Sequence, residues 1–109
     1  SPLETDGRLV IYDAGLPEPE LDVEIRDSGG RLIGICDLVY RKQRVLIEVE
    51  GDHHRTDRAQ WERDIVKYAG YAAAGWQLVR LTSTHIRGSR PSAPGVVREA
   101  LARAGYPGV

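Results

Sequence analysis

The sequence contains no methionine, a single cysteine and no apolar run long enough to span a bilayer. It also lacks a signal-peptide pattern, so we expect a cytoplasmic protein with no membrane segment. Cys36 cannot form an internal disulfide, and its apolar neighbours in the sequence predict a buried, reduced thiol. Because natural chains start with methionine, we expect these 109 residues to be either a processed protein or, in better agreement with the sequence, one domain of a longer protein with a further domain fused on its N-terminal side.

The sequence also lacks an excess of positive charge. Its formal net charge at pH 7 is -1, whereas a typical nucleic-acid-binding module is clearly basic. Composition therefore argues against a general binder of polyanions. That argument weakens if carboxylates of the chain bind divalent cations, because a bound cation reverses the local charge.

Apolar periodicity and turn residues divide the chain into helices and strands. We expect helices over residues 1–14, 57–74 and 96–104, and strands over residues 21–26, 31–40, 45–50 and 76–81. Short links between the first three strands predict an antiparallel meander. A helix between the last two strands predicts a parallel crossover. The expected fold is α/β, with three layers (α/β/α) around a central mixed β-sheet.

The helix over residues 57–74 has the strongest pattern in the chain. Apolar residues recur along it at helical spacing and predict one face against the core: Trp61, Ile65, Tyr68, Ala69, Ala72 and Ala73. Trp61 and Trp76 both fit apolar patterns, so we expect them in the core rather than on a base-stacking surface.

The strand that begins at Val45 ends in a cluster of acidic and histidine residues. Its apolar start predicts a strand buried on both faces. Side chains alternate along a strand, so Glu48 and Glu50 point to the same face. Asp52, His53 and His54 follow directly. Two desolvated carboxylates side by side require a cation, a shared proton or a basic partner.

Asp37 is an isolated carboxylate in a strand that otherwise has the pattern of a buried one. In the meander it lies beside Glu48, and like charges opposite each other destabilise a sheet unless something compensates. A simpler interpretation places Asp37 at a strand end, solvated or paired with Arg44. Clustered carboxylate oxygens favour Mg²⁺ or Mn²⁺. Zinc is the weaker alternative, because the adjacent His53 and His54 diverge.

These residues carry a resemblance to a known group of proteins. Asp37 and the segment Ile47–His54 resemble the core of the PD-(D/E)xK nuclease superfamily, which has the restriction-endonuclease-like fold. The closer likeness is to very-short-patch-repair endonucleases and to DUF559-type domains. Further segments carry it along nearly the whole chain: Gly15–Pro19, Asp52–Arg58, Gln60–Asp64 and Ala74–Trp76.

The resemblance implies roles for individual residues. Asp37 and Glu48 would be metal ligands, joined by the backbone carbonyl of Val49. Glu50 stands where the superfamily usually has its catalytic lysine, which is a departure from the pattern. His54 matches the histidine that the repair-endonuclease branch uses, and would act as general base or acid. Glu4 would correspond to a first-helix glutamate of some members, or would simply complete a helix cap with Ser1.

The function implied is a Mg²⁺- or Mn²⁺-dependent endonuclease that hydrolyses DNA phosphodiester bonds. Arg55, Arg58 and Arg63 flank the site and would contact phosphates, although a solvated charged face explains each of them as well. The alternative function is a catalytically inactive domain that binds DNA or a protein, for example in a toxin–antitoxin or regulatory system. Absence of the usual lysine and the near-neutral charge favour this alternative.

Overall fold

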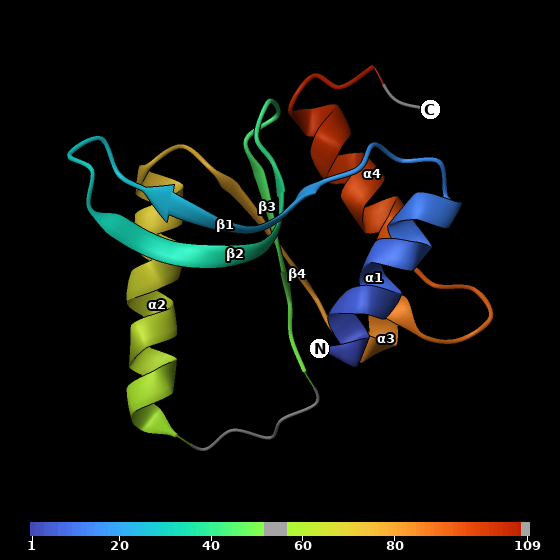
Figure 1. Cartoon of the computed structure of the whole chain (residues 1–109), viewed down its shortest axis with the longest axis horizontal. Coiled ribbons are helices and arrows are strands. Elements are labelled where there is room, and N and C mark those ends of the chain that lie inside the picture. Colours follow the sequence, from blue (N-terminus) through green and yellow to red (C-terminus); the bar gives the residue numbers. More distant parts are fainter. Residues whose placement is uncertain (52–56, 108–109) are drawn as a thin grey trace.

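The computed structural model describes residues 1–51 and 57–107 as a mixed α/β fold (Figure 1). The elements in chain order are α1 (Pro2–Asp13), β1 (Glu20–Arg26), β2 (Leu32–Tyr40), β3 (Val45–Val49), α2 (Arg58–Ala73), β4 (Gln77–Leu81), α3 (Ser83–Ile86) and α4 (Ala93–Arg103). None of the described helices has the length and apolar character that crossing a membrane requires.

The four strands form one sheet in the order β1-β2-β3-β4. β2 pairs antiparallel with both β1 and β3. β3 pairs parallel with β4, and α2 connects these two strands along the chain. The predicted meander and the predicted parallel crossover are therefore both confirmed. β1 is an edge strand, in agreement with its alternation of apolar and polar residues.

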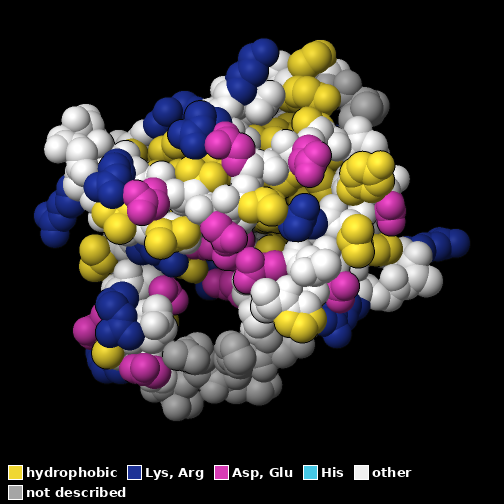
Figure 2. Space-filling model, in the orientation of Figure 1, with side chains coloured by type: hydrophobic (Ala, Val, Ile, Leu, Met, Phe, Trp, Pro, Cys, Tyr) yellow, Lys and Arg dark blue, Asp and Glu magenta, His cyan; other side chains and the backbone are white. Residues whose placement is uncertain are grey.

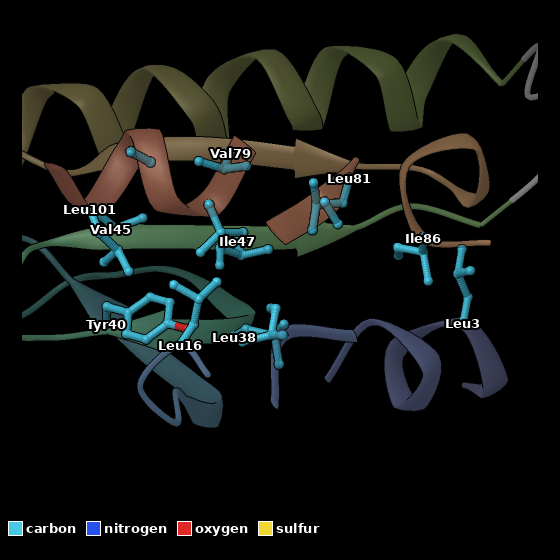
Figure 3. Close-up of a cluster of buried hydrophobic side chains, with 14 residues drawn as sticks. Leu3, Leu16, Leu38, Tyr40, Val45, Ile47, Val79, Leu81, Ile86 and Leu101 are labelled. Atoms are coloured by element: carbon cyan, nitrogen blue, oxygen red, sulfur yellow. The ribbon is translucent and has the colours of Figure 1, made fainter. Parts of the chain in front are cut away.

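Helices cover both faces of the sheet, which gives the three layers that the sequence predicts. On one face, α1 and α4 enclose the larger core, which contains Leu3, Leu38, Ile47, Leu81 and Leu101 (Figure 3). On the other face, Tyr71 of α2 packs with Ile25, Cys36, Val39 and Leu46. β3 contributes to both cores, because its residues Val45, Leu46 and Ile47 are fully buried.

Both ends of α1 follow from local sequence signals. The Ser1 hydroxyl accepts a hydrogen bond from the Glu4 N–H, and Pro2 occupies the first turn, where no backbone donor is needed. Gly15 adopts φ +76 directly after the helix, a conformation that glycine reaches without steric cost. These caps place α1 so that its first turn lies near the sheet.

Three predictions about the helices are wrong. The residues between the last predicted strand and the last predicted helix, for which no helix was expected, contain the short helix α3, and α4 starts at Ala93 rather than at residue 96, with Pro94 in its first turn. The third concerns α2. Trp61 and Ile65 were expected in the core but are exposed, and Tyr71 is the one fully buried residue of this helix. Trp76 does pack, partly buried, against the second core.

Candidate functional site

The site lies where β2 and β3 separate. Leu38 pairs with Ile47 at the end of the ladder, so the next position in register brings Asp37 opposite Glu48. The Asp37 side chain turns towards β3, and its Oδ2 accepts a hydrogen bond of 2.8 Å from the Val49 N–H. The expected proximity of Asp37 and Glu48 is confirmed. The alternative pairing with Arg44 is not observed, because the Arg44 guanidinium binds the carbonyl of Ala74 instead.

Asp37 is the titratable group of this site that folding perturbs most clearly. Burial raises the pKa of its carboxyl from 3.8 to about 7, and the Val49 N–H opposes this rise. The negative charges of Glu48 and Glu4, and a hydrogen bond to the Glu48 carboxyl, contribute smaller parts of the same rise. Near neutral pH, the Asp37 carboxyl is therefore present both in its protonated form, which shares a proton with Glu48, and in its charged form, which a cation would stabilise.

Asp37 also belongs to a cluster of three carboxylates. Glu4 from α1, Asp22 from β1 and Asp37 from β2 each offer an oxygen within 4.8 Å of the others. Figure 2 shows acidic side chains gathered near the centre of this face of the molecule. Glu4 thus takes part in the N-terminal cap with Ser1 and also belongs to the carboxylate cluster.

Asp22 is a site residue that sequence reasoning missed. In the sequence it occupies the polar, outward position of an alternating strand. In the structure it adopts φ +50, between Leu21, which pairs with Leu38, and Val23, which pairs with Cys36. This left-handed conformation is one that aspartate tolerates better than most residues. Only the register of β1 and β2 in the structure places Asp22 opposite Asp37, and the local pattern of neither strand shows it.

Glu48 is buried, with 7% of its surface exposed. Its Oε1 lies 3.2 Å from Lys67 Nζ of α2. The contact is an ion pair rather than an aligned hydrogen bond, since Oε1 has no hydrogen-bond partner among the described residues. Gly34 makes room for this arrangement, because a Cβ there would lie 2.7 Å from Lys67 Cδ and 2.5 Å from the Tyr71 hydroxyl oxygen.

Lys67 is the second residue that sequence reasoning missed. The central strand carries Glu50 where a lysine was expected from the resemblance, and Lys67 brings an ammonium group to Glu48 from a helix instead. A helical residue eighteen positions beyond β3 cannot be assigned to the strand end from sequence spacing alone. The pairing of Lys67 with Glu48 can be recognised only from the way α2 packs on the sheet.

Glu50 points to the same side of β3 as Glu48, as alternation predicts, and it is already engaged by donors. Its Oε1 accepts hydrogen bonds from Arg80 Nη2 at 2.6 Å, from Arg80 Nε at 3.0 Å and from the Tyr68 hydroxyl at 3.2 Å. Burial raises the pKa of Tyr68, so its hydroxyl remains a donor. The Arg80 guanidinium therefore compensates the negative charge of Glu50 without a metal ion.

The other predicted site residues divide into two groups. Asp52, His53, His54 and Arg55 lie outside the described residues. Arg58 and Arg63 stand on the first turns of α2, where Arg58 forms an ion pair with Glu62 and Arg63 donates to Gln60. These contacts fit a solvated helix surface and leave a role in phosphate binding as a hypothesis.

Cys36 does not suit a zinc site. Its thiol is fully buried, and burial raises its pKa to about 12, so the thiolate that zinc requires is disfavoured. Its Sγ lies 3.4 Å from the carbonyl oxygen of Ile47, to which it donates a weak hydrogen bond. The oxygen ligands of the carboxylate cluster suit Mg²⁺ or Mn²⁺ better.

Comparison with known proteins gives two relatives. The chain is similar to uncharacterized proteins of Mycobacterium tuberculosis strains CDC 1551 / Oshkosh and ATCC 25618 / H37Rv. Each is 31% identical over 87 residues, which cover 80% of this chain and 32% of the relative. The chain thus spans about a third of the length of these relatives. No protein-family model and no solved structure matches it.

Proposed function

We propose that this chain is a metal-dependent nuclease domain of the restriction-endonuclease-like type that hydrolyses DNA phosphodiester bonds. The observation that carries the proposal is the position of Asp37. Its carboxyl belongs both to the cluster with Glu4 and Asp22 and to the pair with buried Glu48. This concentration of carboxylates at a strand end costs stability unless a cation relieves it.

The donor set fits a hard divalent cation. All of the contributing groups offer oxygen atoms, which Mg²⁺ and Mn²⁺ prefer, and the buried Glu48 Oε1 has an ion pair with Lys67 but no hydrogen bond among the described residues. Glu4, Asp22 and Asp37 would hold the ion, with Glu48 and the Val49 carbonyl beside it. When bound, such an ion neutralises charge on the phosphate and activates water.

The remaining residues would place the substrate and move protons. Lys67 brings a positive charge next to Glu48, where it would orient the scissile phosphate or the attacking water, the role that the resemblance assigns to a strand lysine. Glu50, held by Arg80 and Tyr68, would fix the end of the strand rather than bind metal. His54 remains the proposed general acid or base.

A second function is supported by a specific observation. Lys67 pairs with Glu48, and Arg80 pairs with Glu50, so the chain itself compensates two of the carboxylates. A domain that keeps the fold but only binds DNA or a protein would need such internal pairing. The two functions differ in whether a divalent metal ion should change the unfolding temperature of the protein.

A cleavage assay tests the proposal. Supercoiled, linear and single-stranded DNA are incubated with Mn²⁺, Mg²⁺ or EDTA, with RNA as a comparison substrate. We expect metal-dependent cutting of DNA that Asp37→Ala abolishes and that Asp13→Ala, an exposed carboxylate on α1, leaves unchanged. Lys67→Met should reduce the rate strongly, whereas Lys42→Met, on the exposed β2–β3 turn, should not.

Two results would decide against the nuclease. Cleavage that persists in Asp37→Ala and in EDTA would show that the activity arises elsewhere. No cleavage, together with no effect of Mn²⁺ on the unfolding temperature, would favour the binding module.

A further inference from the structure

Two buried oxygen atoms lie unpaired between α2 and the sheet. Among the residues that the structure describes, Glu48 Oε1 and the Tyr71 hydroxyl are the buried side-chain oxygens without a hydrogen-bond partner. One is a carboxylate acceptor and the other is a hydroxyl donor, so each offers what the other lacks. A buried polar group without a partner costs stability. Phenylalanine would fill the same space in the second core, so packing alone does not account for the hydroxyl.

Both oxygens lie next to Lys67. The lysine Nζ is 3.2 Å from Glu48 Oε1. A Cβ at Gly34 would lie 2.7 Å from Lys67 Cδ and 2.5 Å from the Tyr71 hydroxyl oxygen, so the lysine stem runs beside that hydroxyl. The nearby negative charge of Glu48 adds to the effect of burial and raises the pKa of Tyr71. The Tyr71 hydroxyl therefore keeps its proton at neutral pH and belongs to the same buried group as the Glu48 carboxylate.

A cation at the carboxylate cluster would change which donor suits Glu48. In the proposed function, on which this inference rests, the ion lies beside Glu48. A divalent ion reverses the local charge, so the Lys67 ammonium is repelled. The Tyr71 hydroxyl is neutral and can stay as a donor. The side chain of Lys67 is 28% exposed, which gives its ammonium a path towards solvent and substrate.

We propose that Tyr71 is a positioning residue of the metal site: its hydroxyl donates a hydrogen bond to Glu48 Oε1 when a divalent cation is bound, and Lys67 is thereby released towards the scissile phosphate. A donor of this kind holds a ligating carboxylate in its orientation and strengthens its hold on the ion. Glu48 thus has two alternative partners. The charged partner, Lys67, serves the metal-free protein, and the neutral partner, Tyr71, serves the metal-bound protein.

Urea unfolding and titration with Mn²⁺ test this exchange of partners. In EDTA the Tyr71 hydroxyl has no partner, so Tyr71→Phe should unfold at the same urea concentration as the wild type or at a higher one. Its affinity for Mn²⁺, measured by calorimetry, should fall about tenfold. The matched control is Tyr40→Phe. Tyr40 is also buried, but its hydroxyl donates to the Pro17 carbonyl at 2.7 Å, so this variant should lose stability and keep its Mn²⁺ affinity.

Lys67 should respond in the opposite sense. Because Lys67 and the cation compete for Glu48, Lys67→Met should bind Mn²⁺ several-fold more tightly than the wild type, although the metal-free variant is less stable. Fluorine NMR of protein labelled with 3-fluorotyrosine observes the tyrosines directly. The Tyr71 signal, identified by its absence from Tyr71→Phe, should shift when Mg²⁺ is added. The Tyr40 signal, identified in the same way, should stay in place.

The outcomes separate the role of Tyr71 from the nuclease proposal. A wild type that binds no Mn²⁺ overturns both. Mn²⁺ binding that Tyr71→Phe leaves unchanged overturns the role of Tyr71 alone, and the metal site stands. A Tyr71→Phe variant that is less stable than the wild type in EDTA also overturns the exchange, because the hydroxyl would then have a partner without metal.

Discussion

Ionisation of Asp37 gives the most direct test of the site. Folding raises the pKa of this carboxyl from 3.8 to about 7. Between these values the folded chain binds one proton more than the unfolded chain, so its free energy of unfolding falls as pH rises. The stabilisation is complete below pH 3.8 and is lost as pH passes through about 7.

The magnitude follows from the shift. Each pH unit inside this window changes the free energy of unfolding by about 1.4 kcal/mol, which gives about 2–3 kcal/mol between pH 5 and pH 8. Asp37 is only partly buried, and solvent screens its interaction with the neighbouring carboxylates. We therefore expect a loss of about 1–2 kcal/mol in a metal-free buffer.

Replacing Asp37 by asparagine isolates this effect. The amide oxygen that Asp37→Asn introduces can still accept the hydrogen bond from the Val49 N–H, but the side chain no longer titrates. Urea unfolding from pH 5 to pH 8 in EDTA should show a smaller decline for the variant than for the wild type. Asp13→Asn, an exposed replacement, should follow the wild-type curve. Parallel curves for wild type and Asp37→Asn would refute the assigned pKa shift.

Metal extends the same experiment. At pH 8, Mg²⁺ or Mn²⁺ that binds the native carboxylates stabilises the fold by about 2.7 kcal/mol at one hundred times its dissociation constant. The wild type should gain this stability and Asp37→Asn should lose most of it. An equal gain in both proteins would place the metal outside the site.

Three other replacements or reactions test neighbouring features. Lys67→Met leaves Glu48 buried without its cation and should lower the free energy of unfolding by about 3 kcal/mol, as measured in urea. Gly34→Ala places a Cβ 2.5 Å from the Tyr71 hydroxyl and should cost about 1–3 kcal/mol in the same assay. Cys36, with a pKa of about 12, should resist iodoacetamide at pH 8 until the chain unfolds, as followed by mass spectrometry.

The sheet could be predicted from sequence because its signals are local. Turn residues and short links fix the order of β1, β2 and β3, and a helix between two apolar strands fixes the parallel pair. The same meander predicted that Asp37 lies beside Glu48, as the register of β2 and β3 confirms. Alternation likewise predicted that Glu48 and Glu50 share a face, and both contact α2.

The missing parts of the site depend on long-range placement. Asp22 has the pattern of an outward residue until φ +50 breaks the alternation of β1, and no local pattern marks that change. Lys67 has the pattern of an ordinary solvated lysine of a helix. Its role depends on which side of α2 meets the sheet, a choice that helical periodicity leaves open between two faces.

The sequence predicted the wrong buried face of α2, and the reason lies in the charged side chains at the end of β3. Glu48 and Glu50 point towards α2, so the helix must offer them donors, and it does so with Lys67 and Tyr68. A helix turned to bury Ile65 instead would leave the buried Glu48 without its cation and would remove the Tyr68 donor from Glu50, and an uncompensated buried charge costs more than exposing an isoleucine. Trp61 and Ile65 therefore stay exposed, on the helix side that also carries the ion pair of Arg58 and Glu62. Burial of Tyr71 in the second core and electrostatic compensation of Glu48 and Glu50 therefore select the same docking face of this helix.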